Sequence, residues 1–381
     1  MGTLKVTPWE VSGELNEDTY NRLVEKFGID FISKELLERI KTISHGNLHP
    51  FLSRKVFFAH RDLGAILDDY ENGKEFYLYT GRGPSGKMHI GHLLPLTFTK
   101  WLQDIFGVHL LIQLTDDEKY LVKNANKEEI EKIMNENILD ILSLGFDPKK
   151  THIIKDYESA KSLYYYATDV AKHTTLSTVK AVFGITDTDN IGKAFFPSMQ
   201  IVPAFIIPAI TGKKMRCLIP YAIDQDPYFR IARDSLPKLG YYKPSSIISK
   251  FLPALQGNSG KMSSSSSPDS AIFLDDDEKS VKRKLMKYAF SGGRNTEKEQ
   301  RKYGANTDVD FSFNIYSLLE PDQGRVDKIY NEYKTGKLMS GEMKVIAADK
   351  ISDFLSELQK NREKVANSVQ DYIFDAENFK L

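Results

Sequence analysis

The clearest pattern of apolar and polar positions lies between residues 76 and 114. Residues 76–80 form an aromatic-rich run that is typical of a β-strand. Residues 91–106 carry apolar side chains at helical spacing, and Gly107 provides a helix end. The mostly apolar run at 108–114 is typical of a parallel strand that is buried on both faces. The pattern therefore predicts a strand, a helix and a second strand in succession.

The same alternation continues through the middle of the chain. Asn126 is the predicted cap of a helix that ends at Gly145, and residues 151–154 form the next strand. A helical region at about 158–212 then precedes a second α/β half. The strands of that half are predicted within 215–219 and 247–252. Strands that alternate with helices indicate an α/β protein with a Rossmann-like, doubly wound parallel sheet.

Beyond about residue 280 the pattern becomes mostly helical. Four stretches have helical spacing, at 281–290, 311–319, 325–333 and 342–369. We therefore expect three parts in the chain. They are an N-terminal extension at 1–73, a Rossmann-type domain at 74–280 that includes the helical insertion at about 158–212, and a helical domain at 281–381.

Composition narrows the classes of protein that fit this pattern. The 381 residues are 41% hydrophobic and 27% charged, which is ordinary for a globular protein. Lysine plus arginine and aspartate plus glutamate number 52 each, so bulk charge gives no indication of a nucleic-acid partner. The single cysteine, Cys217, excludes an intrachain disulfide and a cysteine-based zinc site. Without a signal peptide or a long apolar run, we expect a cytoplasmic protein with no membrane span.

Residues 81–92 combine glycines and histidines at the predicted junction of a strand with a helix. Backbone amides at a helix N-terminus are unpaired and favour phosphate. His89 and His92 are three residues apart and so share one helical face, and Gly91 leaves room for adenine to pack. The alternative is a tight turn with two surface histidines. The segment is not a Walker A loop, because Met88 stands where that loop has Ser or Thr.

The glycines of this segment also allow a different nucleotide. Gly81, Gly83 and Gly86 match the spacing of a dinucleotide-binding loop. That fingerprint needs an acidic residue about 20 positions further on, at the ribose. Asp104 is near that distance but falls inside the predicted helix. A nicotinamide or flavin site is therefore a weaker alternative.

A second segment with a chemical signal is Lys261-Met262-Ser263-Ser264-Ser265, within a Gly/Ser-rich stretch at 257–268. A lysine there can neutralise the negative charge that develops on pyrophosphate as it leaves. Serine hydroxyls and backbone amides can hold the same oxygens. The alternative is a solvated, serine-rich linker of low complexity.

Together the two segments resemble the signature motifs of class I aminoacyl-tRNA synthetases. His89-Ile90-Gly91-His92 matches the family's His-Ile-Gly-His without change. The second segment matches Lys-Met-Ser-Lys-Ser except that Ser264 replaces the second lysine, which shifts more of the pyrophosphate contact onto Lys261 and backbone amides. Further segments are similar to the cytoplasmic tryptophanyl-tRNA synthetases of eukaryotes, at 79–85, 112–120, 196–200 and 222–230. The resemblance runs from about residue 7 to beyond residue 350.

The resemblance implies an enzyme, a tryptophan–tRNA ligase that activates L-tryptophan with ATP and then transfers it to tRNA(Trp). The catalytic residues that it implies are His89, His92, Lys261 and Arg82. Those implied at ATP are Gly81, Gly83, Gly91, Thr115, Lys119, Met262, Ser263, Ser264 and Ser265. Those implied at tryptophan are Tyr79 and Gln113 for the indole nitrogen, and Glu118, Gln200 and Gln225 for the amino-acid backbone groups.

Physical chemistry supports the need for such a tryptophan pocket. The indole N–H is the single polar handle on a large apolar ring, so a selective site needs a buried acceptor for it. Tyr79 and Gln113 fall in predicted parallel strands, whose carboxyl ends line the ligand crevice. The alternatives are strand packing for Tyr79, a solvated charge for Glu118 and a capping role for Gln225.

The resemblance also implies a cofactor and partners. Mg²⁺ would be held chiefly by oxygens of ATP, because Asp116, Asp117 and Asp224 do not make a convincing metal cage, so no metal site of the protein itself is expected. The helical domain would read the anticodon, and the loop at 291–306 is the candidate contact. Family members are homodimers, so a homodimer is expected here.

Three other functions fit parts of the same sequence. A small-molecule adenylating enzyme of the superfamily, such as a pantothenate–β-alanine ligase, would share the nucleotide motifs. The large helical domain at 281–381 counts against it. A synthetase-derived binding protein without catalysis would not need His89, His92 and Lys261 intact. A tyrosine–tRNA ligase is the nearest alternative among enzymes.

Overall fold

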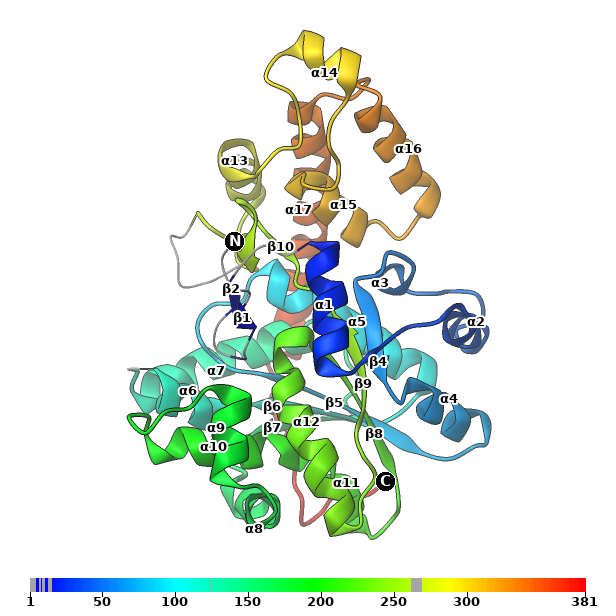
Figure 1. Cartoon of the computed structure of the whole chain (residues 1–381). Coiled ribbons are helices and arrows are strands. Elements are labelled where there is room, and N and C mark those ends of the chain that lie inside the picture. The colour runs from blue at the N-terminus through cyan, green and yellow to red at the C-terminus, as the bar shows by residue number, and fades with distance from the viewer. Residues whose placement is uncertain (1–4, 7, 9–10, 13–15, 124, 262–268) are drawn as a thin grey trace.

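The computed structural model describes residues 5–6, 8, 11–12, 16–123, 125–261 and 269–381. Its centre is a seven-stranded sheet in the order β3-β4-β9-β8-β5-β6-β7 (Figure 1). These strands are β3 Asp30–Phe31, β4 Phe57–Arg61, β5 Phe76–Arg82, β6 Leu110–Leu114, β7 Thr151–Lys155, β8 Arg216–Ala222 and β9 Ser245–Ser249. Two short antiparallel pairs lie outside this sheet, β1 (Lys5–Val6) with β2 (Val11–Ser12) and β10 (Pro253–Ala254) with β11 (Gly257–Lys261).

The strand order confirms the predicted fold class. Strands β5 to β9 run parallel, and along the sheet they read β7-β6-β5-β8-β9. This is the order of a doubly wound Rossmann-like sheet, with its switch point between β5 and β8. The five parallel strands are those that the apolar runs predicted. The sequence did not predict β3 and β4, which extend the sheet as antiparallel strands beside β9.

Two apolar cores cover the two faces of the sheet. In β5, Leu78 belongs to one core while Tyr77 and Tyr79 belong to the other, because successive strand residues point to opposite faces. The first face is covered by α2 Lys34–Ile43, α3 Pro50–Ser53, α4 Leu63–Glu71, α5 Ile90–Phe106 and α7 Lys127–Leu142. The second face is covered by α1 Glu17–Phe27, α8 Ala160–Lys172, α9 Leu176–Phe183, α10 Ile191–Ile201, α11 Ile206–Thr211 and α12 Asp226–Ser235. Short turns complete this region, α6 Asp116–Val122, η1 Val202–Ala204, η2 Ile223–Gln225 and η3 Leu236–Leu239.

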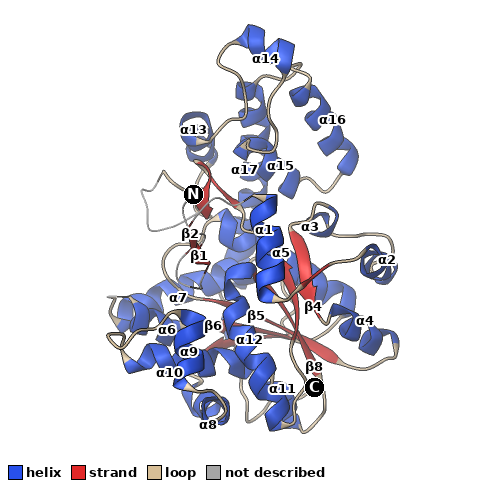
Figure 2. Cartoon of the chain, in the orientation of Figure 1, coloured by secondary structure: helices blue, strands red, loops and turns tan. Residues whose placement is uncertain are grey.

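Residues 278–365 form helices, most of which lie at one end of the molecule, and the C-terminus lies at the other end (Figures 1 and 2). They are α13 Glu278–Tyr288, α14 Glu297–Tyr303, α15 Phe311–Leu319, α16 Gln323–Lys334 and α17 Ser340–Val365. Four of them match the predicted helical stretches. Their apolar residues, such as Val281 and Ile351, belong to the same core as α5 and α7. The helices therefore rest on the sheet region through continuous apolar packing.

The expectation of a loop at 291–306 was wrong in part, because α14 lies within it. Thr296 caps this helix by accepting the backbone N–H of Glu299. Its sequence is polar all round and Gln300 is its buried residue, so apolar periodicity could not reveal it. Gly292 allows a close backbone approach, since a Cβ there would lie 1.8 Å from the carbonyl oxygen of Asn306.

The N-terminal strand β4 and the C-terminal tail are both joined to the central region of the protein. Arg61, at the end of β4, forms an ion pair with buried Asp226 at 3.0 Å. After α17 and η4 (Val369–Tyr372), Ile373 pairs in parallel with Ile153 of β7, and the N–H of Phe374 donates to the Ile153 carbonyl at 2.9 Å. The sheet thus gains β4 from the N-terminal part of the chain and a short pairing with Ile373 from its C-terminal part. Within the described parts of the chain, every helix lacks the length or the apolar character that a membrane span needs.

Candidate active site

A pocket of about 510 Å³ opens where four parallel strands end. Its walls come from the segments that follow β5, β6, β8 and β9, and the neighbours β5 and β8 form the switch point of the sheet. Ligands of open α/β sheets bind at this position, because chain segments leave in opposite directions there. The predicted site residues that line the pocket are Gly81, Arg82, Gly83, His89, Gly91, His92, Thr115, Glu118, Lys119, Gln200 and Gln225.

The two histidines lie at the start of α5. His89 is the N-cap residue, with extended backbone angles of φ −126° and ψ 167°. Its backbone N–H donates to Nδ1 of His92 at 3.4 Å, and the two rings stack with centroids 3.5 Å apart. Because Nδ1 accepts this bond, a neutral His92 carries its proton on Nε2. The prediction that both imidazoles share one face of the helix start is confirmed.

Buried polar atoms in this part of the pocket lack partners. Among the described residues, both ring nitrogens of His89 and Nε and Nη2 of Arg82 are buried without a hydrogen-bond partner. Burial, together with the nearby Arg82, lowers the pKa of His89 to about 3, so the ring is neutral at pH 7. Burial also lowers the pKa of Arg82, to about 10, which leaves the guanidinium charged. Each unpaired buried group costs roughly 1–3 kcal/mol, and a bound anion would remove that cost.

An ion pair between Glu118 and Lys119 also lines the pocket. Nζ of Lys119 lies 2.6 Å from Oε2 of Glu118, which also accepts from the Thr115 hydroxyl at 3.0 Å. These residues sit on α6 and its preceding residue, directly after β6. A Cβ at Gly83 would lie 2.1 Å from Cε of Lys119, so glycine is what lets this side chain cross the turn after β5.

A second set of polar residues is buried behind the pocket wall. Tyr79 and Gln113 do not line the pocket and are fully buried, but hydrogen bonds connect them to Gln200, which does. The Tyr79 hydroxyl donates to Oε1 of Gln113 at 2.6 Å and lies 2.8 Å from the Gln200 carbonyl. Nε2 of Gln200 donates to the Tyr79 hydroxyl at 2.5 Å and to Oε1 of Gln113 at 3.2 Å. The structure therefore brings three of the five residues predicted to bind tryptophan into one network.

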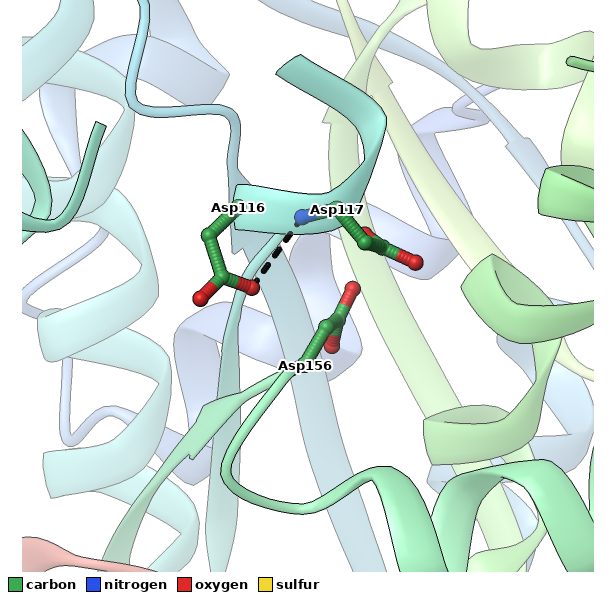
Figure 3. Close-up of side chains that lie close together, drawn as sticks. All are labelled: Asp116, Asp117 and Asp156. Atoms are coloured by element: carbon green, nitrogen blue, oxygen red, sulfur yellow. Dashed lines mark hydrogen bonds between the residues drawn. The ribbon is translucent and has the colours of Figure 1, made fainter. Parts of the chain in front are cut away.

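Gln113 leads onward to a group of acids. Within the described residues, Asp116, Asp117 and Asp156 carry oxygen atoms that lie within 4.8 Å of one another (Figure 3). The two carboxyl oxygens of Asp156 accept from Nε2 of Gln113, at 2.8 and 3.0 Å. Oδ1 of Asp116 accepts the backbone N–H groups of Asp117 and Tyr157. Burial raises the pKa of Asp116 to about 6 and that of Asp156 well above its ordinary value.

This acid group does not fit a resident divalent ion. Its oxygens already accept hydrogen bonds, and burial favours their protonated forms. Sequence reasoning had grouped Asp116 and Asp117 with Asp224, whereas Asp224 lines the pocket and Asp156 completes the cluster. Asp156 follows β7 directly. Because the carboxyl ends of parallel strands line the ligand crevice, the sequence also carried a signal for this residue.

The second motif meets the first through the residues that follow it. Lys261 is the last residue of β11, while Met262, Ser263, Ser264 and Ser265 lie outside the described residues. Further on, the N–H of Ile90 donates to the Ile272 carbonyl at 3.0 Å, and the N–H of Leu274 donates to the Met88 carbonyl at 3.3 Å. The segment after the second motif is therefore paired with the start of α5.

Several pocket residues were not singled out from the sequence. Pro8 lines the pocket from the N-terminal segment, and the aromatic rings of Tyr228 and Phe229 line it from α12. Gln225 is the N-cap residue of α12, but its side chain makes no capping hydrogen bond and faces the pocket. Pro8 is far in sequence from the strands that form the pocket, so no local sequence pattern predicts its place there.

Comparison with known proteins identifies the family. The chain matches the family model described as tRNA synthetases class I (W and Y) over residues 71–356. It is 48% identical to the tryptophan–tRNA ligase of Sulfurisphaera tokodaii, over 98% of this chain and 96% of the relative. It is 44% identical to the human cytoplasmic tryptophan–tRNA ligase, over 96% of this chain and 79% of that protein. The crystal structure of Plasmodium falciparum tryptophanyl-tRNA synthetase superposes with a TM-score of 0.88 at 42% identity, covering 94% of this chain and 97% of that one.

A match of this extent settles the class, and the chain belongs to the W and Y family of class I tRNA synthetases. The resemblance to eukaryotic cytoplasmic members is confirmed by the human relative, and the archaeal relative shows that the similarity extends beyond eukaryotes. An ATP-dependent aminoacyl-tRNA synthetase is the enzyme class that this family defines.

Proposed function

We propose that the protein is a tryptophan–tRNA ligase. It joins L-tryptophan to ATP as tryptophanyl-adenylate, releases pyrophosphate, and then transfers tryptophan to tRNA(Trp) for protein synthesis. The observation that carries the proposal is the buried network of Tyr79, Gln113 and Gln200 behind the pocket. Its acceptor, Oε1 of Gln113, is held by Nε2 of Gln200 through a long contact of 3.2 Å, and the single N–H of indole can take the place of that contact. A substrate without that donor would leave an acceptor unpaired.

The phosphate end of the pocket supports adenylate formation. The carboxylate of tryptophan attacks the α-phosphorus of ATP, and the bond to pyrophosphate breaks. The unpaired donors of Arg82 and His89 are placed to bind the oxygens that gain charge, and no protein nucleophile is needed. His92 and Lys261 are proposed to stabilise the same charge, and the backbone amides and serine hydroxyls of residues 262–265, which lie outside the described residues, are proposed to bind pyrophosphate. Gly91 is proposed to leave room for the nucleotide. The space beside Gly81 and Gly83 is taken by Gln113 and Lys119, so these two glycines are proposed to meet ATP through their backbone.

Glu118 and Lys119 exchange partners during binding in this proposal. The ammonium group of tryptophan takes the place of Lys119 at the Glu118 carboxylate, with Gln200 and Gln225 as further contacts. Lys119 is then released toward the α-phosphate, next to Thr115. The ion pair at 2.6 Å thus keeps Glu118 neutralised until the substrate supplies its own cation.

Magnesium enters as the complex of ATP, that is, as part of the substrate. The residues that line the pocket include cations and neutral donors suited to phosphate, and the buried acids behind Gln113 are engaged in hydrogen bonds. Mg²⁺ is therefore held chiefly by the oxygens of ATP. Bound in this way, it neutralises phosphate charge.

The helical end of the molecule is proposed to contact tRNA. Within residues 281–381, α14 presents Tyr303 with 58% of its surface exposed, and Nζ of Lys302 lies 4.8 Å from its ring centroid. An exposed ring beside cations can stack on an unpaired anticodon base. The residues 291–306 that contain α14 therefore remain the candidate anticodon contact, and 74–280 is the proposed catalytic domain.

A homodimer in the cytoplasm is the proposed state of the enzyme. The helical insertion α8 to α10 exposes large side chains that a monomer would bury, Tyr164, Tyr165, Leu176 and Ile191. Such exposed apolar side chains on neighbouring helices are typical of a protein–protein interface. Sedimentation at micromolar concentration tests this part, and a monomer would contradict it.

ATP–pyrophosphate exchange with each of the twenty amino acids is the test of the activity. We expect exchange with tryptophan and, in a second assay, charging of tRNA(Trp). Exchange with tyrosine alone would assign the tyrosine branch of the family. Exchange without any tRNA charging would favour a small-molecule adenylating enzyme, and no exchange at all would favour a non-catalytic binding protein.

A further inference from the structure

The chemistry of the Gln113 carboxamide depends on which way the group points. Its oxygen accepts hydrogen bonds and its nitrogen donates them, so only one orientation offers an acceptor to an indole N–H. In the structure Oε1 faces the Tyr79 hydroxyl and Nε2 of Gln200, while Nε2 faces the two carboxyl oxygens of Asp156. Rotation by half a turn would reverse these roles. Recognition of tryptophan therefore requires that this orientation be held.

We propose that Asp156 is a positioning residue for tryptophan selection: its carboxyl group accepts the Gln113 amide and so keeps Oε1 turned toward the indole nitrogen. This inference rests on the proposed function and adds a residue to the same site. Asp156 is 1% exposed and lies behind Gln113, so it touches neither substrate. It acts through Gln113 alone.

Asp156 can only accept from Gln113 because its own proton is used elsewhere. Oxygens of Asp156 and Asp117 lie within 4.8 Å of each other, and because two carboxyl groups this close do not both ionise, the pair shares one proton in this proposal. Burial raises the pKa of both Asp117 and Asp156, but Asp117 also accepts the backbone N–H of Glu118 at 2.6 Å, which favours Asp117 as the ionised member of the pair. Burial raises the pKa of Asp156 well above its ordinary value, so Asp156 holds the proton and donates it to Asp117.

The resulting chain of bonds has one consistent direction. Asp156 donates to Asp117, Gln113 donates to Asp156, and the Tyr79 hydroxyl donates to Gln113. A reversed Gln113 would place its oxygen against the acceptor face of Asp156 and its nitrogen against Nε2 of Gln200. Both buried groups would then lose a bond, at a cost that keeps the reversed orientation rare. The acceptor is thus fixed before the substrate arrives.

The test compares L-tryptophan with L-3-benzothienylalanine, in which sulfur replaces the indole N–H. The ratio of their kcat/KM values in pyrophosphate exchange measures recognition of that donor. Asp156→Ala should lower this ratio by roughly tenfold to a hundredfold, because Gln113 is free to turn its nitrogen toward the substrate. The loss should appear in KM for tryptophan, with kcat little changed. Asp156→Ser, whose hydroxyl ends one bond short of the carboxyl oxygens that contact Gln113, should give the same loss if the alanine variant does not fold.

Two further variants separate positioning from a general structural role. Asp156→Asn mimics the protonated acid, with its oxygen toward Gln113 and its nitrogen toward Asp117, so it should retain the ratio. Asp116→Asn is the matched control, because Asp116 belongs to the same acid group but does not touch Gln113. It should also retain the ratio. Loss of activity in both asparagine variants, restored by excess Mg²⁺, would instead indicate a metal site and overturn the inference.

The remaining outcomes distinguish failure of the inference about Asp156 from failure of the proposed function. Equal losses for tryptophan and benzothienylalanine in Asp156→Ala or Asp156→Ser would show that Asp156 supports the fold only, and would overturn the inference while the proposed function stands. An asparagine variant that behaves like alanine would overturn it as well. Absence of tryptophan-dependent exchange in the unaltered protein would overturn the proposed function together with this inference.

Discussion

The two ends of the pocket treat their polar groups in opposite ways. At the phosphate end, described atoms of Arg82 and His89 are buried without hydrogen-bond partners. At the amino-acid end, Tyr79, Gln113 and Gln200 bond to one another and onward to Asp156. The first end keeps donors ready for a large, highly charged anion. The second end fixes the direction of one acceptor for a single neutral donor.

The difference follows from what each ligand can provide. A triphosphate carries many acceptor oxygens and enough charge to repay the burial of donors without partners. An indole N–H gives one modest hydrogen bond, so selectivity depends on an acceptor whose orientation is already fixed. At the proposed phosphate end, the unpaired donors should therefore lower the stability of the fold and raise the rate of activation. At the proposed amino-acid end, the hydrogen bonds should raise both the stability of the fold and the selectivity for tryptophan.

Arg82→Leu is the change with the largest expected effect on this comparison. Removing the guanidinium should lower the kcat of tryptophan activation by roughly 10²–10³, because a charge-stabilising donor is lost. The melting temperature should stay the same or rise, since a buried cation with unpaired nitrogens disappears. Pyrophosphate exchange and thermal unfolding measure the two effects. Arg82→Lys, which keeps the charge, should lose less activity; a drop in stability with Arg82→Leu would contradict the comparison.

Tyr79→Phe is the corresponding change at the other end and should show the opposite pattern. It removes the hydroxyl that donates to Gln113 and accepts from Gln200. We expect KM for tryptophan to rise by roughly tenfold to a hundredfold and stability to fall by about 1–3 kcal/mol, while kcat changes less. Steady-state exchange and urea unfolding provide the measurements. Tyr77→Phe in the same strand is the control, because its hydroxyl bonds to the Pro203 carbonyl instead.

Gly83→Ala tests Lys119, which lies between the two ends of the pocket, and its expected effect on KM is smaller. The added Cβ would meet Cε of Lys119 at 2.1 Å and Nζ at 2.6 Å, so the flexible end of that side chain must move. The fold should tolerate the change, while KM for ATP rises by about threefold to tenfold as Lys119 is displaced. Exchange at varied ATP concentration checks this. A larger effect on tryptophan than on ATP would place Lys119 with the amino acid instead.

The pH dependence of stability should differ in sign between the two ends. The pKa of His89 is lowered by burial from 6.5 to about 3, so its contribution is present above pH 6.5 and is lost as the pH falls toward 3. The pKa of Asp156 is raised well above 3.8 by burial, so its contribution is present below pH 3.8 and is lost as the pH rises.

Two variants make this difference measurable in urea unfolding between pH 4 and 8. His89→Gln should lose stability less steeply than the unaltered protein as the pH falls below 6.5. Asp156→Asn should gain stability relative to the unaltered protein as the pH rises above about 4, by at most ~1.4 kcal/mol per pH unit. Parallel curves for both variants and the unaltered protein would mean that neither group titrates as the structure indicates.

Local sequence was sufficient for most elements and for the phosphate end. The aromatic strand, the glycine turn and the apolar spacing that follow one another from β5 to α5 are set by neighbouring residues. Arg82, His89 and His92 lie within this one unit, so their proximity could be predicted before any tertiary contact was known. The polar helix α14 was missed because it lacks the apolar stripe on which such predictions depend.

The amino-acid end depended on pairing between distant segments. Gln113 meets Asp156 only because β6 and β7 are adjacent in parallel register, with Gln113 opposite Ile154. Gln200 arrives on α10, which covers the face of the sheet to which Tyr79 points. No periodicity within a strand encodes which strand will lie next to it.

The sequence by itself determined that this chain alternates strands and helices, predicted a phosphate site at the start of one helix, and indicated an adenylate-forming synthetase by its motifs. The tertiary structure alone decided which donors of the described residues stay unpaired, which acids lie together, and which way Gln113 points. The physical reason is that propensity and capping act over a few residues, whereas burial and hydrogen-bond direction depend on groups that folding brings together from distant parts of the chain.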